Sequence, residues 1–354
     1  MRSRCWLLCL ILLTSIAVAR AGERVHIIDT PNRGITPDAE VDQAGIIHLA
    51  YVLNEDVYYV KSPDDGKTFS EPLRVNSEPK SALAGMHRGP DLAVGKGGLV
   101  HVIWYNNGYQ RKLPQDQWGV MYSHLNPEGT AFLPARNLNH KPSDNFSLAA
   151  DSSGSVAVVW MAKGIYIHSS RDNGVTFSEP LRMELADPCE CCGSRAYFDA
   201  DGTLFCSYRD KANNWRDMYV AMLPKMARSF TREKLSLTPW QINGCPMSGN
   251  FLTGGKAGVT AAWETKGGVY FGRLDKGGHL RQPGEIRAGT GKYPVICSAP
   301  DGSTLVAWKQ SSALAWRLFD ADGKPQDEPQ SVPSPNPHRP SGVVTKSGQF
   351  LLFN

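Results

Sequence analysis

The sequence predicts an all-β chain folded as a β-propeller, with seven blades favoured and six as the alternative. Three observations predict this fold: a turn motif that occurs twice, an apolar run ending in an aromatic residue that recurs along the chain, and a lack of convincing amphipathic helices. Strand-rich units repeated every 45 to 56 residues are typical of propeller blades. Two packed β-sandwiches are the alternative architecture, which seven similar units disfavour.

The recurring apolar runs mark the second strand of each unit. Each run follows a turn that contains glycine, and most are followed by a third strand rich in Val, Ile and Tyr. The runs end at Tyr51, Trp104, Trp160, Tyr208, Trp263, Trp308 and Phe353. The last unit, which starts at Ser341, stops after two strands. The N-terminal run Val25–Ile28 can supply its missing outer strand, which closes the ring and removes exposed strand edges.

Residues 1–21 have the features of a cleaved export signal, and residues 22–354 are expected to form one propeller domain. Two arginines precede an apolar run over 5–18, and Ala19-Arg20-Ala21 has the small-x-small form of a cleavage site. The run is short for a membrane span, and an uncleaved N-terminal anchor is the alternative. We therefore expect an exported protein, periplasmic or extracellular, with no integral membrane segment after signal removal.

The charge balance excludes two classes of partner. The net charge of +4 falls to +1 when the three arginines of the signal are removed. So small a charge gives no reason to expect nucleic acid or an anionic membrane surface as a partner. Six cysteines remain after signal removal, and an even number in an exported chain allows disulfides.

The repeated turn motif has the form Ser-x-Asp-x-Gly-x-Thr-aromatic. The aspartate can accept backbone N–H groups across the turn, the glycine allows a positive φ, and the aromatic ring packs under the sheet. Both copies continue into Ser-Glu-Pro-Leu-Arg, which marks an internal repeat. The motif residues are Ser62, Asp64, Gly66, Thr68 and Phe69 in the first copy and Ser170, Asp172, Gly174, Thr176 and Phe177 in the second.

These two turns resemble the Asp-box, the bacterial neuraminidase repeat of sialidase-like propellers. The resemblance covers almost all of the mature chain and is specific for architecture, because the Asp-box also occurs in propellers with other activities. Sialidases bind the substrate carboxylate through three arginines and use a tyrosine nucleophile, a glutamate base and an aspartate acid/base. The chain departs from true sialidases because it has no Arg-Ile-Pro motif.

Candidate functional residues lie on one face of the predicted ring. This front face carries the loops that lead into the innermost strands and the loops between the second and third strands. Arg88, Arg195 and Arg339 stand at or near the starts of innermost strands, where guanidinium groups suit an anionic ligand. The alternative is that these arginines cap strand carbonyls and pair with loop acids. His87 and His338 precede two of the arginines and join the predicted substrate-binding set.

The resemblance implies a reacting centre on the same face. Tyr293 occupies the equivalent position in the sixth unit, and Glu264 and Asp210 follow second strands. A Tyr293–Glu264 pair would act as nucleophile and base, with Asp210 for acid/base work. The leading hypothesis is a protein that binds or hydrolyses an extracellular glycan or glycoprotein. Whether it is an enzyme is left open; an enzyme would be a sialidase-like glycoside hydrolase.

A cysteine cluster supports the competing hypothesis of a non-catalytic propeller for protein interaction or soft-metal binding. Cys189, Cys191 and Cys192 fall within four residues, and Cys245 stands at the corresponding loop of the next unit. One of the three can bridge to Cys245. The cluster can instead bind copper or zinc, with His87 or His338 as a further ligand, or hold free or redox-active thiols.

Overall fold

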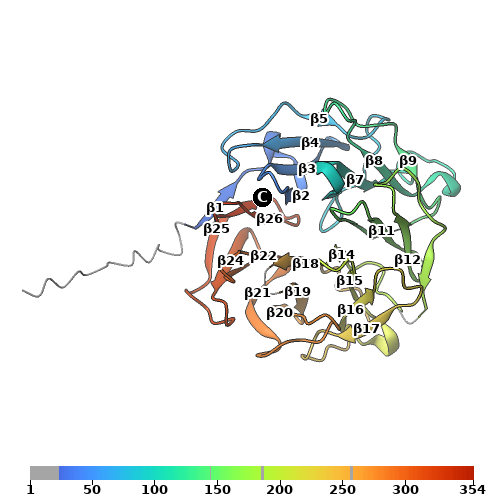
Figure 1. Cartoon of the computed structure of the whole chain (residues 1–354). Coiled ribbons are helices and arrows are strands. Elements are labelled where there is room, and N and C mark those ends of the chain that lie inside the picture. Colours follow the sequence, from blue (N-terminus) through green and yellow to red (C-terminus); the bar gives the residue numbers. More distant parts are fainter. Residues whose placement is uncertain (1–23, 144, 185–186, 256–257) are drawn as a thin grey trace, which may run out of the picture.

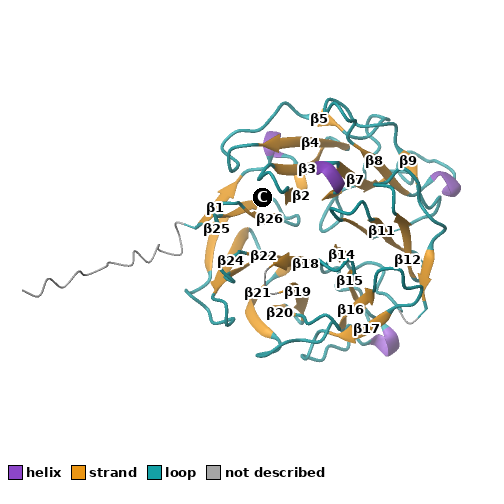
Figure 2. Ribbon diagram, in the orientation of Figure 1, coloured by secondary structure: helices purple, strands orange, loops and turns teal. Residues whose placement is uncertain are grey.

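The computed structural model describes residues 24–354 except 144, 185–186 and 256–257. Seven sheets are arranged around a central axis, which confirms the seven-bladed propeller (Figure 1). In the described part of the chain nearly all regular structure is strand, and its four helices are single 3-10 turns (Figure 2). The predicted export signal lies outside the described residues. Among the described residues, no helix is long and apolar enough to span a membrane.

Six blades are four-stranded antiparallel sheets whose strands follow chain order from the axis outward. Blade 1 contains β2 (Ile35–Val41), β3 (Ile47–Leu53), β4 (Asp56–Ser62) and β5 (Leu73–Arg74). Blade 2 contains β6 (Asp91–Val94), β7 (Val100–Tyr105), β8 (Val120–His124) and β9 (Arg136–Asn137). Blade 3 contains β10 (Phe146–Ala150), β11 (Val156–Met161), β12 (Ile165–Ser170) and β13 (Leu181–Met183).

The next three blades repeat this arrangement. Blade 4 contains β14 (Arg195–Phe198), β15 (Leu204–Arg209), β16 (Met218–Leu223) and β17 (Thr231–Lys234). Blade 5 contains β18 (Asn250–Gly255), β19 (Gly258–Thr265), β20 (Gly268–Arg273) and β21 (Ile286–Thr290). Blade 6 contains β22 (Lys292–Ser298), β23 (Thr304–Gln310), β24 (Ala313–Phe319) and β25 (Gln330–Pro333). The 3-10 turns are η2 (Pro31–Arg33), η3 (Lys96–Gly98), η4 (Gln115–Gln117) and η5 (Ala212–Asn214).

Blade 7 closes the ring as predicted. It contains β26 (Ser341–Val344), β27 (Phe350–Phe353) and β1 (Val25–Ile28). Strand β1 pairs with β27 in parallel, with Val25 opposite Phe350 and Ile28 opposite Phe353. The two ends of the described chain therefore share one sheet. This pairing covers the edge of β27, which would otherwise be exposed.

The aromatic ends of the apolar runs are core residues. Trp104, Trp160, Trp263 and Trp308 each expose 2% or less of their surface. They lie on the second strand of their blades, which is apolar on both faces because neighbouring blades cover it. Burying a large aromatic side chain is among the strongest single contributions to a core. The core therefore consists of layers between blades, and the axis is free for polar groups.

The two repeated turns have the same hydrogen bonds. The Asp64 carboxylate accepts from the Thr68 N–H at 2.9 Å and the Thr68 hydroxyl at 2.7 Å, and Asp172 and Thr176 repeat this at 2.9 and 2.6 Å. These bonds lower the pKa of both aspartates to about 2. The turns join the third and fourth strands of blades 1 and 3. Their face is the back face, away from the candidate site.

Candidate functional site

A cluster of two arginines and two aspartates lies at the axis, and we call it the axial ion cluster. Arg195 Nη1 is 3.0 Å from Asp38 Oδ1 and 3.4 Å from Asp91 Oδ1. Arg339 Nη2 is 2.9 Å from the same Asp91 oxygen. The Asp38 carboxylate also accepts the Leu92 N–H at 2.8 Å. The cluster therefore joins blades 1, 2, 4 and 7 through groups that bury their charges together.

Two of the three arginines predicted to bind a ligand belong to the axial ion cluster. Arg195 exposes 8% of its surface, and its guanidinium lies 4.3 Å from the centroid of the Phe251 ring. Both Arg195 and Arg339 have carboxylate partners, so their positive charges are compensated within the chain. This matches the alternative in which strand-start arginines pair with acids. Arg88, the third predicted arginine, is not a member of the axial ion cluster.

A cavity of about 260 Å³ lies along the inner strands, and Arg195 lines it. Glu40 also lines this cavity and accepts the Val94 N–H at 3.0 Å. Burial raises the pKa of the Glu40 carboxyl to about 8. A second hollow of about 960 Å³ lies between blades 3 and 4, beside Phe177 and Met226 on the back face. Of the predicted front-face residues, only Arg195 lines the first cavity, and none lines the second.

His87, Arg88 and Tyr293 meet on the front face, and together with Glu264 we call them the axial site. The ring centroids of His87 and Tyr293 are 5.9 Å apart. The positive charge of Arg88 lowers the pKa of both neighbours, although burial dominates each. A Cβ on Gly249 would lie 3.5 Å from Tyr293 Cα and 3.9 Å from His87 Cβ. The loops before blades 2, 5 and 6 therefore converge here.

Tyr293 has an unusual backbone for an aromatic residue. Its φ is +54°, in the left-handed region, and the pairing of β22 with β23 shifts register beside it. Such a conformation costs about 1–3 kcal/mol and persists where the surroundings impose it. Burial raises the pKa of the Tyr293 phenol. The irregularity lies at a half-buried tyrosine whose ring is beside His87.

His87 is a buried, neutral imidazole. Its Nε2 donates to Asn145 Oδ1 at 3.0 Å, and within the described chain its Nδ1 has no hydrogen-bond partner. Burial lowers the pKa of His87 to about 3. His338 has a different role, because its Nδ1 accepts the Met86 N–H at 2.8 Å. His87 therefore keeps a buried acceptor nitrogen without a partner among the described residues, whereas His338 joins two loops.

Glu264 lies behind Tyr293. It exposes 1% of its surface, and its Oε1 accepts the Gly267 N–H at 2.6 Å. Its Oε2 has no hydrogen-bond partner among the described residues and is 3.9 Å from Arg209 Nη2. The negative charge of Glu264 contributes to the raised pKa of Tyr293. Among the described residues Glu264 makes no hydrogen bond to the Tyr293 phenol, so the predicted pair interacts through the charge of Glu264 and not through a direct contact.

Asp210 lies apart from this pair. Its carboxylate is 2.7 Å from Arg232 Nη1 on the outer strand β17 and caps the N–H of Ala212. The predicted acid/base residue is thus joined to the outer part of blade 4. Arg209, the preceding residue, was missed by the sequence analysis. It is fully buried, donates to Ser248 Oγ at 2.8 Å, and lies 5.0 Å from the Trp240 ring centroid.

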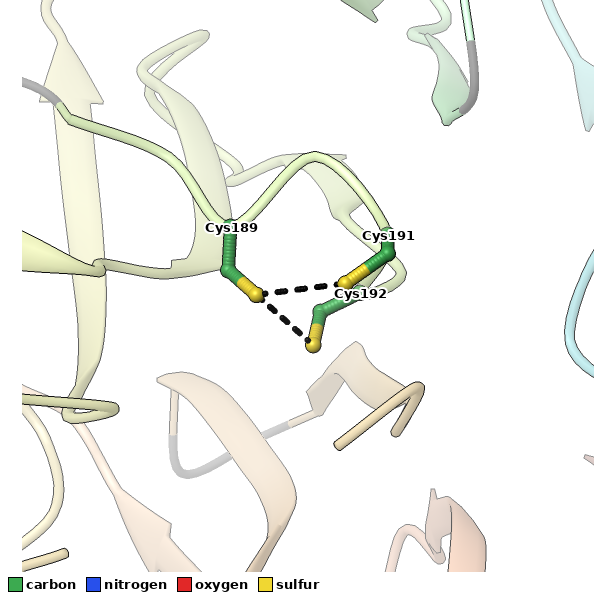
Figure 3. A group of neighbouring side chains, drawn as sticks. All are labelled: Cys189, Cys191 and Cys192. Carbon is green, nitrogen blue, oxygen red and sulfur yellow. Dashed lines mark hydrogen bonds between the residues drawn. The ribbon is translucent and has the colours of Figure 1, made fainter. Parts of the chain in front are cut away.

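The cysteine cluster lies beside Arg209, and Figure 3 shows three of its side chains pointing toward one another. Cys191 and Cys245 form a disulfide between the loops before blades 4 and 5, with Cα atoms 6.5 Å apart. This distance is within the usual range for a disulfide. Cys189 and Cys192 are buried free thiols. The structure therefore selects Cys191 as the partner of Cys245 and leaves two thiols beside the bond.

The remaining thiols are perturbed in opposite directions. Cys189 Sγ is 3.4 Å from Cys192 Sγ, and the hydrogen bond between them raises the pKa of Cys189 and lowers that of Cys192 to about 6. The positive charge of Arg209 adds to the effect on Cys192. The sulfur atoms of Cys189, Cys191 and Cys192 all lie within 4.8 Å of one another, so the cluster can hold a soft metal ion.

No protein-family model and no curated protein sequence matches the chain. Solved structures do match. An ulvan lyase shares 13% identity and a TM-score of 0.53 over 90% of each chain. The NanB sialidase of Streptococcus pneumoniae shares 11% identity and a TM-score of 0.51, over 80% of this chain and 66% of its own.

A third match is an α-L-arabinofuranosidase from Fusarium graminearum, with 12% identity and a TM-score of 0.50 over 85% of this chain and 93% of its own. The chain shares its fold with these proteins. Identities this low show common architecture, so the chemistry of the axial site has to be argued from its own residues.

Proposed function

We propose that this chain is an exported propeller that binds or hydrolyses an extracellular glycan at the axial site. The observation that carries the proposal is the convergence of His87, Arg88 and Tyr293 on the axis, with the carboxylate of Glu264 behind them. A cation and an aromatic ring suit a sugar that carries an acidic group. The solved structures with this fold include two glycosidases and a polysaccharide lyase, which supports the same class of substrate.

Each residue of the axial site has a distinct role in this proposal. Arg88 binds the anionic group of the glycan, and His87 packs beside the Tyr293 ring and supports its position. Tyr293 packs against the sugar ring. In hydrolysis its phenol oxygen attacks the anomeric carbon, the glycosidic bond breaks, and the aglycone leaves with a proton taken from water. Glu264 accepts the phenol proton, because the raised pKa of Tyr293 makes a base necessary, and water then hydrolyses the bond between the sugar and Tyr293.

Binding and hydrolysis are tested separately. A glycan array identifies ligands for the mature protein, and release of a fluorogenic leaving group from sialosides and arabinofuranosides measures hydrolysis. Arg88→Met is expected to weaken binding at least tenfold. Tyr293→Phe is expected to remove hydrolysis while changing affinity much less. Arg111→Met, on the rim of blade 2, is the matched control. Unchanged binding in Arg88→Met together with unchanged hydrolysis in Tyr293→Phe would rule out the axial site.

A second candidate function is soft-metal binding, favoured by the three clustered sulfur atoms. Copper(I) and zinc both bind thiolates, and Cys189 and Cys192 are the free thiols available to them. Elemental analysis of pure protein before and after a Cys192→Ser substitution tests this candidate. Copper or zinc that is lost with the substitution supports it, and metal-free protein after loading with either ion removes it.

A further inference from the structure

The sulfur contacts place a free thiol against a disulfide. Cys189 Sγ is 3.4 Å from Cys191 Sγ, which is bonded to Cys245, and 3.4 Å from Cys192 Sγ. The first contact joins a nucleophilic atom to the sulfur that it would attack. The second joins the same atom to a thiol that could resolve the product. Thiol–disulfide exchange needs both contacts, and side chains on one short loop supply them.

We propose that Cys189, Cys191, Cys192 and Cys245 form a thiol–disulfide exchange site on the front face. The disulfide moves between two positions, Cys191–Cys245 across blades 4 and 5 and Cys189–Cys192 within one loop. External dithiols reach the site through Cys245. This activity rests on neither the glycan proposal nor the metal proposal.

The burial of the four sulfurs separates an outer pair from an inner pair. Cys189 and Cys192 expose 3% and 1% of their surfaces, whereas Cys191 is half-buried and Cys245 is exposed. An outside thiolate can therefore attack the Cys191–Cys245 bond at Cys245 but cannot reach the inner pair. Electrons pass to or from the inner pair through exchange at Cys191.

The charges around the inner pair support exchange. Arg209 places a fully buried positive charge beside the inner pair. Arg209 is held in place by Ser248 Oγ at 2.8 Å, and Ser248 O accepts the Gly193 N–H at 2.9 Å. A buried cation at this point has no acidic partner closer than the Glu264 oxygen at 3.9 Å within the described chain. Its guanidinium is held by hydrogen bonds to Ser248 Oγ and to the backbone oxygens of Arg216 and Glu264.

The internal exchange balances without an external oxidant. Cys189 passes its proton to the Cys192 thiolate and attacks Cys191 Sγ, forming Cys189–Cys191 and releasing Cys245 as a thiolate. Cys192 then gives up that proton and attacks Cys189 Sγ, forming Cys189–Cys192 while Cys191 leaves as the thiol. One disulfide, one negative charge and one proton are present before and after.

Electron exchange with the outside balances as well. One thiolate of an external dithiol attacks Cys245 Sγ, and Cys191 leaves as a thiolate. The second thiol of the reagent resolves the mixed disulfide and releases Cys245. The reagent departs as its own disulfide, and the chain has gained two electrons and two protons.

Moving the disulfide changes what joins the front-face loops. The Cys191–Cys245 bond ties the loop before blade 5 to blade 4, and the same loop carries Gly249, which packs against Tyr293. The Cys189–Cys192 bond makes no such link between blades. Exchange therefore alters the restraint on one wall of the axial site.

The test is peptide mapping of protein that holds a single disulfide among these four cysteines. Metal is first removed with a chelator. Dithiothreitol is then added until one disulfide per chain remains among the four cysteines, and free thiols are trapped by acid quenching and alkylation. Wild-type protein is expected to contain both the Cys191–Cys245 and the Cys189–Cys192 bonds. Cys192→Ser is expected to accumulate Cys189–Cys191, because the second step is blocked. Cys189→Ser is expected to retain only Cys191–Cys245.

Cys206→Ser is the matched control, because Cys206 is a buried free thiol on β15 away from the cluster. Circular dichroism verifies that each variant keeps its β-sheet signal. Two results together would overturn the proposal: Cys191–Cys245 as the sole bond in wild-type protein, and no Cys189–Cys191 bond in Cys192→Ser. A variant that loses its fold is replaced by the alanine substitution at the same position, and the same two results are required of it.

Discussion

Replacing Arg195 with methionine removes the cation that lies between two buried carboxylates. Asp91 keeps Arg339 at 2.9 Å, whereas Asp38 keeps only the Leu92 N–H at 2.8 Å. Breaking a buried ion pair typically costs about 3–5 kcal/mol. Because one of the two aspartates retains its partner, we expect a loss near the lower end, about 3 kcal/mol in the free energy of unfolding. Methionine preserves most of the packing against Phe251.

The loss should depend on pH in a definite direction. Burial already raises the pKa of Asp38 from 3.8, and Arg195 opposes that shift. Without Arg195 the folded-state pKa rises further, so the folded variant holds a proton that the unfolded chain releases above pH 3.8. The variant's deficit therefore grows as pH rises through this range and shrinks toward acid.

Urea unfolding at pH 5 and pH 8 measures both effects. Arg111→Met is the control, because Arg111 pairs with an exposed Glu78 at 2.6 Å and such surface pairs contribute less than about 1 kcal/mol. Replacing Asp38 and Arg195 together by leucine should recover part of the loss, because no charge is left unpaired. A deficit below about 1 kcal/mol for Arg195→Met, or one that grows toward acid, would refute the reasoning.

Three further predictions concern the axis, a turn and the ring closure. The free energy of unfolding of Glu40→Gln should rise by about 2 kcal/mol relative to wild type between pH 5 and pH 9. The Glu40 carboxyl has a pKa of about 8 in the folded chain against 4.5 when unfolded, so wild type loses stability as pH rises, by an amount discounted for partial exposure to the cavity. A difference in urea unfolding that does not change with pH would contradict this. Gly174→Ala should lower the free energy of unfolding by about 1–3 kcal/mol more than Gly97→Ala. Both glycines have a positive φ, but only a Cβ at Gly174 would overlap Tyr122, so equal losses would argue against that contact. Deleting residues 22–28 should lower the melting temperature and promote aggregation measured by light scattering, since it exposes the edge of β27; a monomeric, equally stable product would contradict the closure.

The fold could be predicted because its signals are local and repeated. Apolar runs ending in Trp104, Trp160 and their equivalents define the second strand of each blade within a few residues. The ring closure by Val25–Ile28 followed from counting strands in the last unit. Such patterns depend on short-range periodicity, which a single sequence displays directly.

The partners at the axis could not be predicted in the same way. Arg195 pairs with an aspartate 157 positions earlier in the chain, and no spacing rule selects Asp38 from the other acids. Arg209 ends an apolar run, so its place beside the cysteine cluster depends on how blades 4 and 5 pack. The positive φ of Tyr293 follows from an irregularity in strand pairing that the sequence does not reveal. For the cysteines, the sequence narrowed the choice to three partners for Cys245, and three-dimensional proximity selected Cys191.

A crystal structure of the mature protein with the glycan identified on the array tests the central claim most directly. The account predicts density for the sugar on the front face at the axis, with an acidic group beside Arg88 and a ring against Tyr293. Density for the sugar on the back face, for example in the second hollow between blades 3 and 4, would contradict it, because the axial site would then play no part in recognition.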